Sequence, residues 1–255
     1  YMNQPELVPW QYIFGRGLTI FIVLNLYLFF EEGITFYKNY MKIGISGIIG
    51  GIGLGIAMIC FIYSITNTSA AITLLCLAIM PFFTALLGFL FLRERISLNV
   101  WIAIILATIG IIIIAIGNTG KASLLGFVFG MMSSIGFSIF SVTLRWRKET
   151  PKFTTVALSG LFCFVIASIF ILSKDQVFFS TSYNGTLFSL HGVLVCFGLI
   201  LYSIGSKAIP AAELTLLSLT EVIGGIFWVW LPIFGINEVP STNTIIGGFF
   251  LFISI

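Results

Sequence analysis

The chain alternates between long apolar runs and short polar connections. Nine apolar segments stand out, at about 10–30, 42–64, 68–92, 98–117, 122–145, 154–173, 187–207, 210–234 and 242–255. Most are near the twenty residues that an α-helix needs to cross a bilayer. Because backbone groups in lipid must be satisfied within their own segment, the pattern predicts helices, and it lacks the short alternating runs of a membrane barrel. We therefore predict an all-α polytopic membrane protein with nine helices visible, the last of them truncated.

Composition supports this fold class and narrows the function. The chain is 59% hydrophobic and 8% charged, whereas soluble domains carry about 25% charged residues. The four cysteines lie in apolar runs without metal-ligand spacing, and there is one histidine. No basic patch indicates nucleic acid, and no motif indicates a nucleotide, a cofactor or an enzyme. The expected partners are therefore a small-molecule substrate and the lipid bilayer.

The basic residues predict how the chain is oriented in the membrane. Cytoplasmic loops are enriched in Lys and Arg, and one set of connections carries most of them: Lys38, Lys42, Arg93, Arg95, Arg145, Arg147, Lys148, Lys152 and Lys207. The opposite set holds Lys121 and Lys174, with Arg16 near that side. The first visible helix then runs from outside to inside, as a second helix would. We therefore expect a preceding helix and ten in all.

A repeat divides the chain. Residues 69–99 and 210–243 both open with an Ala-Ala pair, continue through a Thr-Leu-Leu, and close with Glu-x-x-Ser-x-Asn, at Glu94 and Glu238. The copies lie five helices apart, and an odd spacing inverts the second copy in the membrane. Inverted repeats are common in secondary transporters, whose substrate sites lie between the repeats. We predict two inverted five-helix repeats, 1–117 and 118–255.

These features resemble the EamA family of the drug/metabolite transporter superfamily. The residues that carry the resemblance are Pro81, Arg93-Glu94-Arg95 and Gly110 in the first copy, and Thr220-Glu221 in the second. Val222 stands where the family often has a proline. The resemblance implies ten helices in two inverted repeats, a central cavity between them, and transport of small metabolites, often amino acids or their derivatives.

Glu221 is the first candidate for function, because it is the one acid in the apolar stretch 216–231. A charge at the bilayer centre is costly, by about 3 kcal/mol on insertion scales. Such a carboxyl group can exchange a proton or hold a cationic ligand. A structural hydrogen bond to a neighbouring helix is the alternative. Trp228, on the same helix face, is expected to line the substrate path or to anchor at the interface.

Other polar residues form weaker candidates. We consider four as substrate contacts or inter-helix hydrogen bonds: Tyr63, Tyr202, Ser138 and Thr73. Five are candidates for gating or for anchoring at the membrane surface, and Arg16 among them alternatively meets an anionic substrate: Glu213, Arg93, Glu94, Arg95 and Arg16. Pro81 is expected to kink its helix, and the small ridge of Gly47, Gly51 and Gly55 to allow close helix packing.

The sequence thus predicts a secondary active transporter in the cell (inner) membrane. It would move a small metabolite, an amino acid or a related solute, by alternating access. The alternative is a proton-coupled exporter of lipophilic or cationic drugs, and protons are the candidate coupling ion in either case. The substrate's identity, the direction of transport and the oligomeric state stay open.

Overall fold

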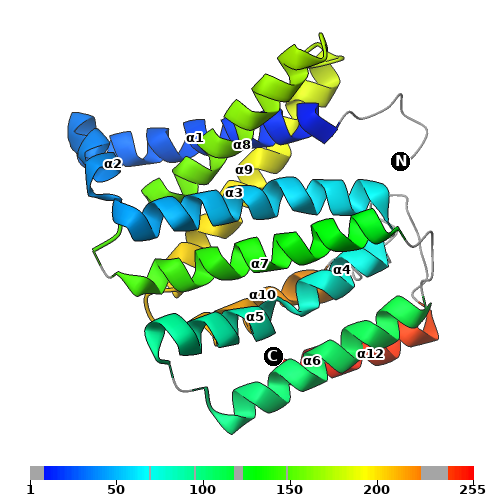
Figure 1. The fold of residues 1–255 in the computed structure, drawn as a ribbon. Helices are drawn as coiled ribbons and strands as arrows, with labels where there is room; N and C mark the ends of the chain where they lie inside the picture. The colour runs from blue at the N-terminus through cyan, green and yellow to red at the C-terminus, as the bar shows by residue number, and fades with distance from the viewer. Residues whose placement is uncertain (1–8, 69, 95, 118–122, 148, 225–240) are drawn as a thin grey trace.

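The computed structural model describes residues 9–68, 70–94, 96–117, 123–147, 149–224 and 241–255. Within these ranges every regular element is helical, which confirms the all-α prediction (Figure 1). The elements are α1 (Pro9–Glu32), η1 (Gly33–Tyr37), α2 (Lys38–Lys42), α3 (Gly44–Asn67), α4 (Ala70–Ala78), α5 (Met80–Leu87), η2 (Gly88–Leu92), α6 (Leu98–Gly117), α7 (Leu124–Trp146), α8 (Lys152–Ser173), α9 (Ser182–Gly205), α10 (Ala211–Ser218) and α12 (Thr242–Ser254). Residues 220–224 are also helical.

Length and surface composition fit a membrane protein. Six helical segments of the described chain are long and apolar enough to span a bilayer, and Leu98–Ile114 and Thr242–Ser254 are shorter apolar helices. Large apolar side chains cover outward faces, such as Ile105, Phe197 and Phe249, each more than half exposed. In lipid such side chains need no protein cover. The chain is a multi-pass integral membrane protein.

The buried side chains form two separate clusters. The first joins α1, α3, α7, α8 and α9 through residues such as Ile20, Leu54 and Phe140. The second joins α4, α5, α6, α10 and α12 through residues such as Ile111 and Leu216. Figure 1 shows the same grouping, with α8 and α9 crossing α1 at one side and α6 lying along α12 at the other. Helix α7 belongs to the first cluster and runs beside α3, and it also runs beside the α4–α5 segment of the second cluster.

Glycine lets α1 and α8 touch through their backbones. A Cβ atom at Gly17 would lie 2.9 Å from the Phe164 nitrogen and 3.0 Å from the Gly160 oxygen. A Cβ at Gly160 would lie 2.8 Å from the Gly17 oxygen and 2.9 Å from the Phe21 nitrogen. Neither position has room for a larger residue. The two helices therefore cross where each has a glycine, Gly17 on α1 and Gly160 on α8.

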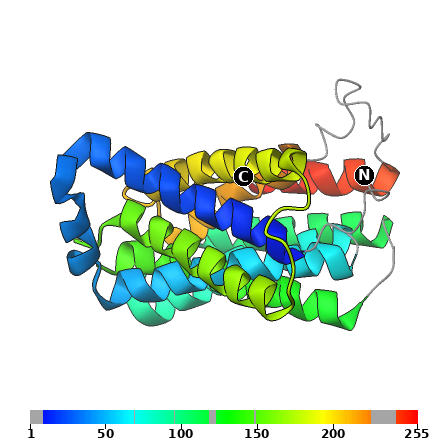
Figure 2. The ribbon, with the colours of Figure 1, turned by 90° about the horizontal axis from the view of Figure 1, so that it is seen from above.

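The same arrangement recurs at two other crossings. Between α3 and α7, a Cβ at Gly53 would lie 2.9 Å from the Gly136 oxygen, and one at Gly136 would lie 2.6 Å from the Gly53 oxygen. Between α6 and α12, a Cβ at Gly110 would lie 2.6 Å from the Gly247 oxygen. Small residues at membrane helix interfaces gain van der Waals contact that apolar burial does not supply in lipid. Figure 2 gives a second view of the packed helices.

We predict that Gly17→Ala destabilises the protein by about 1–3 kcal/mol, because the added methyl group forces α1 and α8 apart. Gly198→Ala on α9 is the matched control, since nothing lies within 4 Å of a Cβ there, and alanine favours the helix. Thermal unfolding of both variants in detergent is the measurement. Equal melting temperatures for the two variants would contradict the prediction.

Candidate functional site

The predicted kink at Pro81 coincides with an interruption of its helix. The α-helix α4 ends at Ala78, Ile79 forms a turn, and α5 begins at Met80 with Pro81 in its first turn. Proline has no N–H to donate and clashes with the preceding turn. The segment then passes into the π-helix η2 and ends at Arg93, which adopts a left-handed conformation with φ 55°.

Serine hydroxyl groups from α7 bond to this interrupted segment. The Ser134 hydroxyl donates to the Cys76 carbonyl oxygen over 2.6 Å, and the Ser138 hydroxyl donates to the Met80 oxygen over 3.0 Å. Both side chains are fully buried. Ser138, a candidate substrate contact in the sequence, is thus placed between two helices. Thr73 lies in a similar position, buried and 2.8 Å from the Ser64 hydroxyl.

We predict that Ser134→Ala destabilises the protein by about 0.6–2 kcal/mol, because it removes an inter-helix hydrogen bond to the Cys76 carbonyl. Ser168→Ala on α8 is the control, since the Ser168 hydroxyl bonds only the Phe164 oxygen of its own helix. Thermal unfolding compares the two. A control variant destabilised as much as Ser134→Ala would remove the reason given for the effect.

A second interruption occurs without proline. The helix α10 ends at Ser218, Leu219 forms a turn, and helix resumes at 220. Three hydroxyl groups here donate to carbonyls three residues earlier, with distances of 2.7–2.9 Å: Thr215 to Ala212, Ser218 to Thr215, and Thr220 to Leu217. Such side-chain bonds to the backbone bend helices. They occur at an interruption that contains no proline.

Glu221 follows this second interruption by two residues, as Pro81 follows the first. Its neighbours Leu219 and Val222 are buried in the second core cluster, whereas Thr220 and Glu221 are exposed. No described residue forms an ion pair with Glu221, and the stretch that follows it, with Trp228, lies outside the described residues. The carboxylate therefore projects from the face of the helix opposite the core.

Aromatic rings connect four helices in the first group. The Tyr63 ring on α3 lies 5.2 Å from Trp10 on α1 and 5.3 Å from Phe129 on α7. Tyr202 on α9 lies 5.1 Å from Phe137, and its hydroxyl is 2.6 Å from that of Ser141. Both tyrosines are half-buried. The two tyrosines occupy matching Tyr-Ser-Ile positions in the predicted repeats, and both contact α7.

Arg16 is buried among the helices of the first group. Its side chain is 4% exposed, and Nη2 donates to the Met58 oxygen on α3 over 2.8 Å. The guanidinium carbon lies 5.6 Å from the centre of the Tyr12 ring. The Tyr12 hydroxyl in turn hydrogen-bonds His191 Nδ1 on α9. Whether Arg16 anchors the chain or meets an anionic substrate stays a prediction; its side chain bonds a carbonyl 42 residues further along the chain.

At the end of the molecule where the sequence places the cytoplasm, Arg145 connects three segments. Its Nε atom lies 2.7 Å from Glu94 Oε1, and Nη1 donates to the Ser206 and Ile209 oxygens over 3.1 and 2.6 Å. Lys152 Nζ donates to the Ser206 hydroxyl over 2.8 Å. Glu94 is thus paired within a polar cluster. Sequence reasoning missed its partner, because Arg145 was counted only among the cytoplasmic charges.

The other candidates for gating lie around this end. Arg93 is exposed, and Glu213 is half-buried in the first turn of α10. Arg95 lies outside the described residues. The glycine ridge faces α8: a Cβ at Gly47 would lie 2.9 Å from the Thr155 hydroxyl, one at Gly51 2.9 Å from Leu158, and one at Gly55 2.5 Å from the Phe162 ring.

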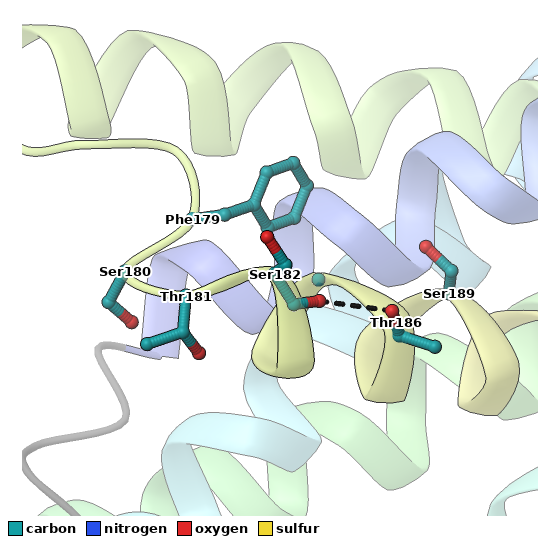
Figure 3. Close-up of a pocket in the computed structure, with 7 residues that line it drawn as sticks. Phe179, Ser180, Thr181, Ser182, Thr186 and Ser189 are labelled. Carbon is teal, nitrogen blue, oxygen red and sulfur yellow. Dashed lines mark hydrogen bonds between the residues drawn. The ribbon is translucent and has the colours of Figure 1, made fainter.

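A surface pocket lies at the opposite end, near the start of α9. Its volume is about 710 Å³ and its walls carry hydroxyl groups and one aromatic ring: Phe179, Ser180, Thr181, Ser182, Gly185, Thr186 and Ser189 (Figure 3). The Ser182 carbonyl accepts the Thr186 hydroxyl over 3.0 Å. Gln11 of α1 fixes the preceding loop by donating to the Val177 oxygen over 2.6 Å. The pocket bears no charged side chain.

Part of the chain resembles known transporters. Residues 2–116 match the EamA-like transporter family. An "Uncharacterized transporter" of Helicobacter pylori is 26% identical over 176 residues, which are 68% of this chain and 58% of that protein. The "Pseudopaline exporter CntI" of Pseudomonas aeruginosa is 24% identical over 204 residues, 79% of this chain and 70% of that protein. The chain thus aligns with little more than half the length of the first of these relatives.

A solved crystal structure has the same fold. It aligns with a TM-score of 0.78 and 15% identity, and the match covers 98% of this chain and 86% of the other. At this identity the likeness concerns the fold alone. The family match and the transporter relatives agree with the membrane helices described above. Residues 2–116 thus resemble the EamA-like transporter family, within the drug/metabolite transporter superfamily.

Proposed function

We propose that this membrane transporter is a secondary active transporter of the inner, or plasma, membrane that moves a small metabolite by alternating access. Its two halves would be residues 1–117 and 118–255, related as inverted repeats. The family match covers most of the first half. Support for the second half comes from contacts between helices that would hold equivalent places in the two proposed repeats.

The contact between α1 and α8 is the observation that carries the proposal. Gly17-Leu18-x-x-Phe21 and Gly160-Leu161-x-x-Phe164 are copies of one motif. Gly17 faces the Gly160 oxygen and the Phe164 nitrogen, and Gly160 faces the Gly17 oxygen and the Phe21 nitrogen. Reciprocal contacts of this kind mark a two-fold axis. An axis between α1 and α8 relates the second helix of one repeat to the second helix of the other.

The interrupted helices support the same architecture. Each predicted repeat contains one, and each breaks two residues before Pro81 or Glu221. Discontinuous helices at corresponding positions line the substrate sites of many secondary transporters. Glu221 is then the ionisable group on the second of these helices. We propose that it takes up and releases the coupling proton.

The ion pair of Glu94 and Arg145 would serve as the cytoplasmic gate. Glu94 belongs to the first half, whereas Arg145, Ser206 and Ile209 belong to the second. The pair therefore ties the halves together at this end, and opening toward the cytoplasm requires its separation. Because Arg145 also holds the turn between α9 and α10, that turn would move with α7.

We expect Glu94→Arg and Arg145→Glu each to reduce solute counterflow in proteoliposomes, by about tenfold, because each places like charges face to face at the gate. The combined exchange should recover much of the loss by restoring an ion pair of opposite polarity. Arg147→Glu, at an exposed position nearby, controls for the change in charge. A double variant no more active than the singles would contradict the gate.

The second test concerns the coupling proton. Glu221→Gln should retain folding, since no described partner depends on the carboxylate, but should lose the dependence of transport on a pH gradient. Glu149→Gln, at an exposed position outside the proposed site, is the control. Counterflow and gradient-driven uptake of amino acids and of cationic dyes are measured in parallel. Unchanged gradient dependence in Glu221→Gln would exclude this role, and preference for the dyes would favour the drug-export alternative.

A further inference from the structure

Arg16 places a positive charge inside the protein without an acid to balance it among the described residues. It lies seven residues into α1, about 10 Å of helix rise from the start, and is 4% exposed. The described part of the chain contains one ion pair, which joins Glu94 and Arg145. None of the described acids is therefore within 4 Å of Arg16: Glu31, Glu32, Glu94, Glu149, Asp175, Glu213 and Glu221.

The contacts that Arg16 does make leave most of its hydrogen-bonding capacity unused. A guanidinium group has five N–H donors. In the described residues Nη2 donates to the Met58 oxygen, and the guanidinium group lies over the Tyr12 ring and interacts with the Tyr12 hydroxyl. A carbonyl and an aromatic face reduce the cost of burial but carry no net negative charge. Buried charges in proteins are normally paired, so the arrangement lacks a counter-ion.

The neighbouring groups add another donor. When the Tyr12 hydroxyl donates to His191 Nδ1, the neutral imidazole carries its proton on Nε2 and can donate there. Tyr12 contacts both groups, since its ring lies 5.6 Å from the Arg16 guanidinium carbon and its hydroxyl bonds His191. Helices α1, α3 and α9 therefore bring a guanidinium and an imidazole N–H to one place. This set of groups complements an anion and repels a cation.

We propose that Arg16, with His191 as a second donor, binds the carboxylate of the transported solute. Guanidinium and carboxylate groups form two parallel charge-assisted hydrogen bonds, and the solute would supply the counter-ion that the described residues lack. The substrate class is then small organic anions and zwitterions with a free carboxylate, amino acids included. The inference rests on the proposed transport function and names the chemistry of its substrate.

The test compares alanine, leucine and glutamate with alaninamide and leucinamide, which lack the free carboxylate. The purified protein is examined by counterflow in proteoliposomes and, separately, by thermal-shift binding in detergent. The wild-type protein should exchange and be stabilised by the acids rather than the amides. Arg16→Gln should raise KM for the acids at least tenfold, the loss expected for a charged hydrogen bond, and Arg16→Lys should recover part of it.

Lys174→Gln is the control, because it removes one exposed positive charge at the same end of the molecule and should leave KM unchanged. If Arg16→Gln is not monodisperse, His191→Gln takes its place, with a smaller rise in KM expected. Binding of the acids without counterflow would sustain the anion site and overturn the transport function. Equal binding of acids and amides, no binding of either, or acid affinity unchanged in both variants would overturn the anion site. Glu6 lies outside the described residues. If Glu6→Gln has the same effect as Arg16→Gln, the counter-ion is an acid of the protein itself, and the anion site is overturned.

Discussion

Direct backbone contact between helices is the constraint on which this structure depends. In lipid, apolar side chains gain nothing by moving from the bilayer to another helix, so helices associate through close packing and polar bonds. At Gly17 and Gly160 the backbones of α1 and α8 meet without any side chain between them. The crossings at Gly53–Gly136 and Gly110–Gly247 repeat the solution. These contacts fix α1 against α8, α3 against α7 and α6 against α12.

The second constraint is that a helix interrupted within the membrane must recover its lost hydrogen bonds. Around Pro81 the recovery comes from another helix, through the Ser134 and Ser138 hydroxyls of α7. Around Leu219 the helix supplies its own hydroxyl groups, from Thr215, Ser218 and Thr220. The two interruptions have different local chemistry, yet each consists of a single turn residue two positions before Pro81 or Glu221.

The sequence predicted the features that depend on local pattern. The apolar runs located the helices, proline located the first interruption, and the charge bias located the end where Glu94 and Arg145 meet. Features that depend on distant contacts were not predictable. The buried Arg16 side chain bonds a carbonyl oxygen on α3. Arg145 pairs with Glu94, which lies 51 residues away in the sequence. No proline marks the second interruption in the sequence.

The polar cluster around Arg145 makes more bonds within the second half of the chain than it makes to the first half. Arg145 binds the turn between α9 and α10 with two hydrogen bonds, and Lys152 adds a third, all within one half of the chain. A single ion pair, with each side chain 24% exposed, reaches across to Glu94. Pairs so accessible to solvent contribute about 1 kcal/mol or less. Under the alternating access proposed above, a solute that binds one state modestly better than the other would be enough to reverse an equilibrium held by this pair.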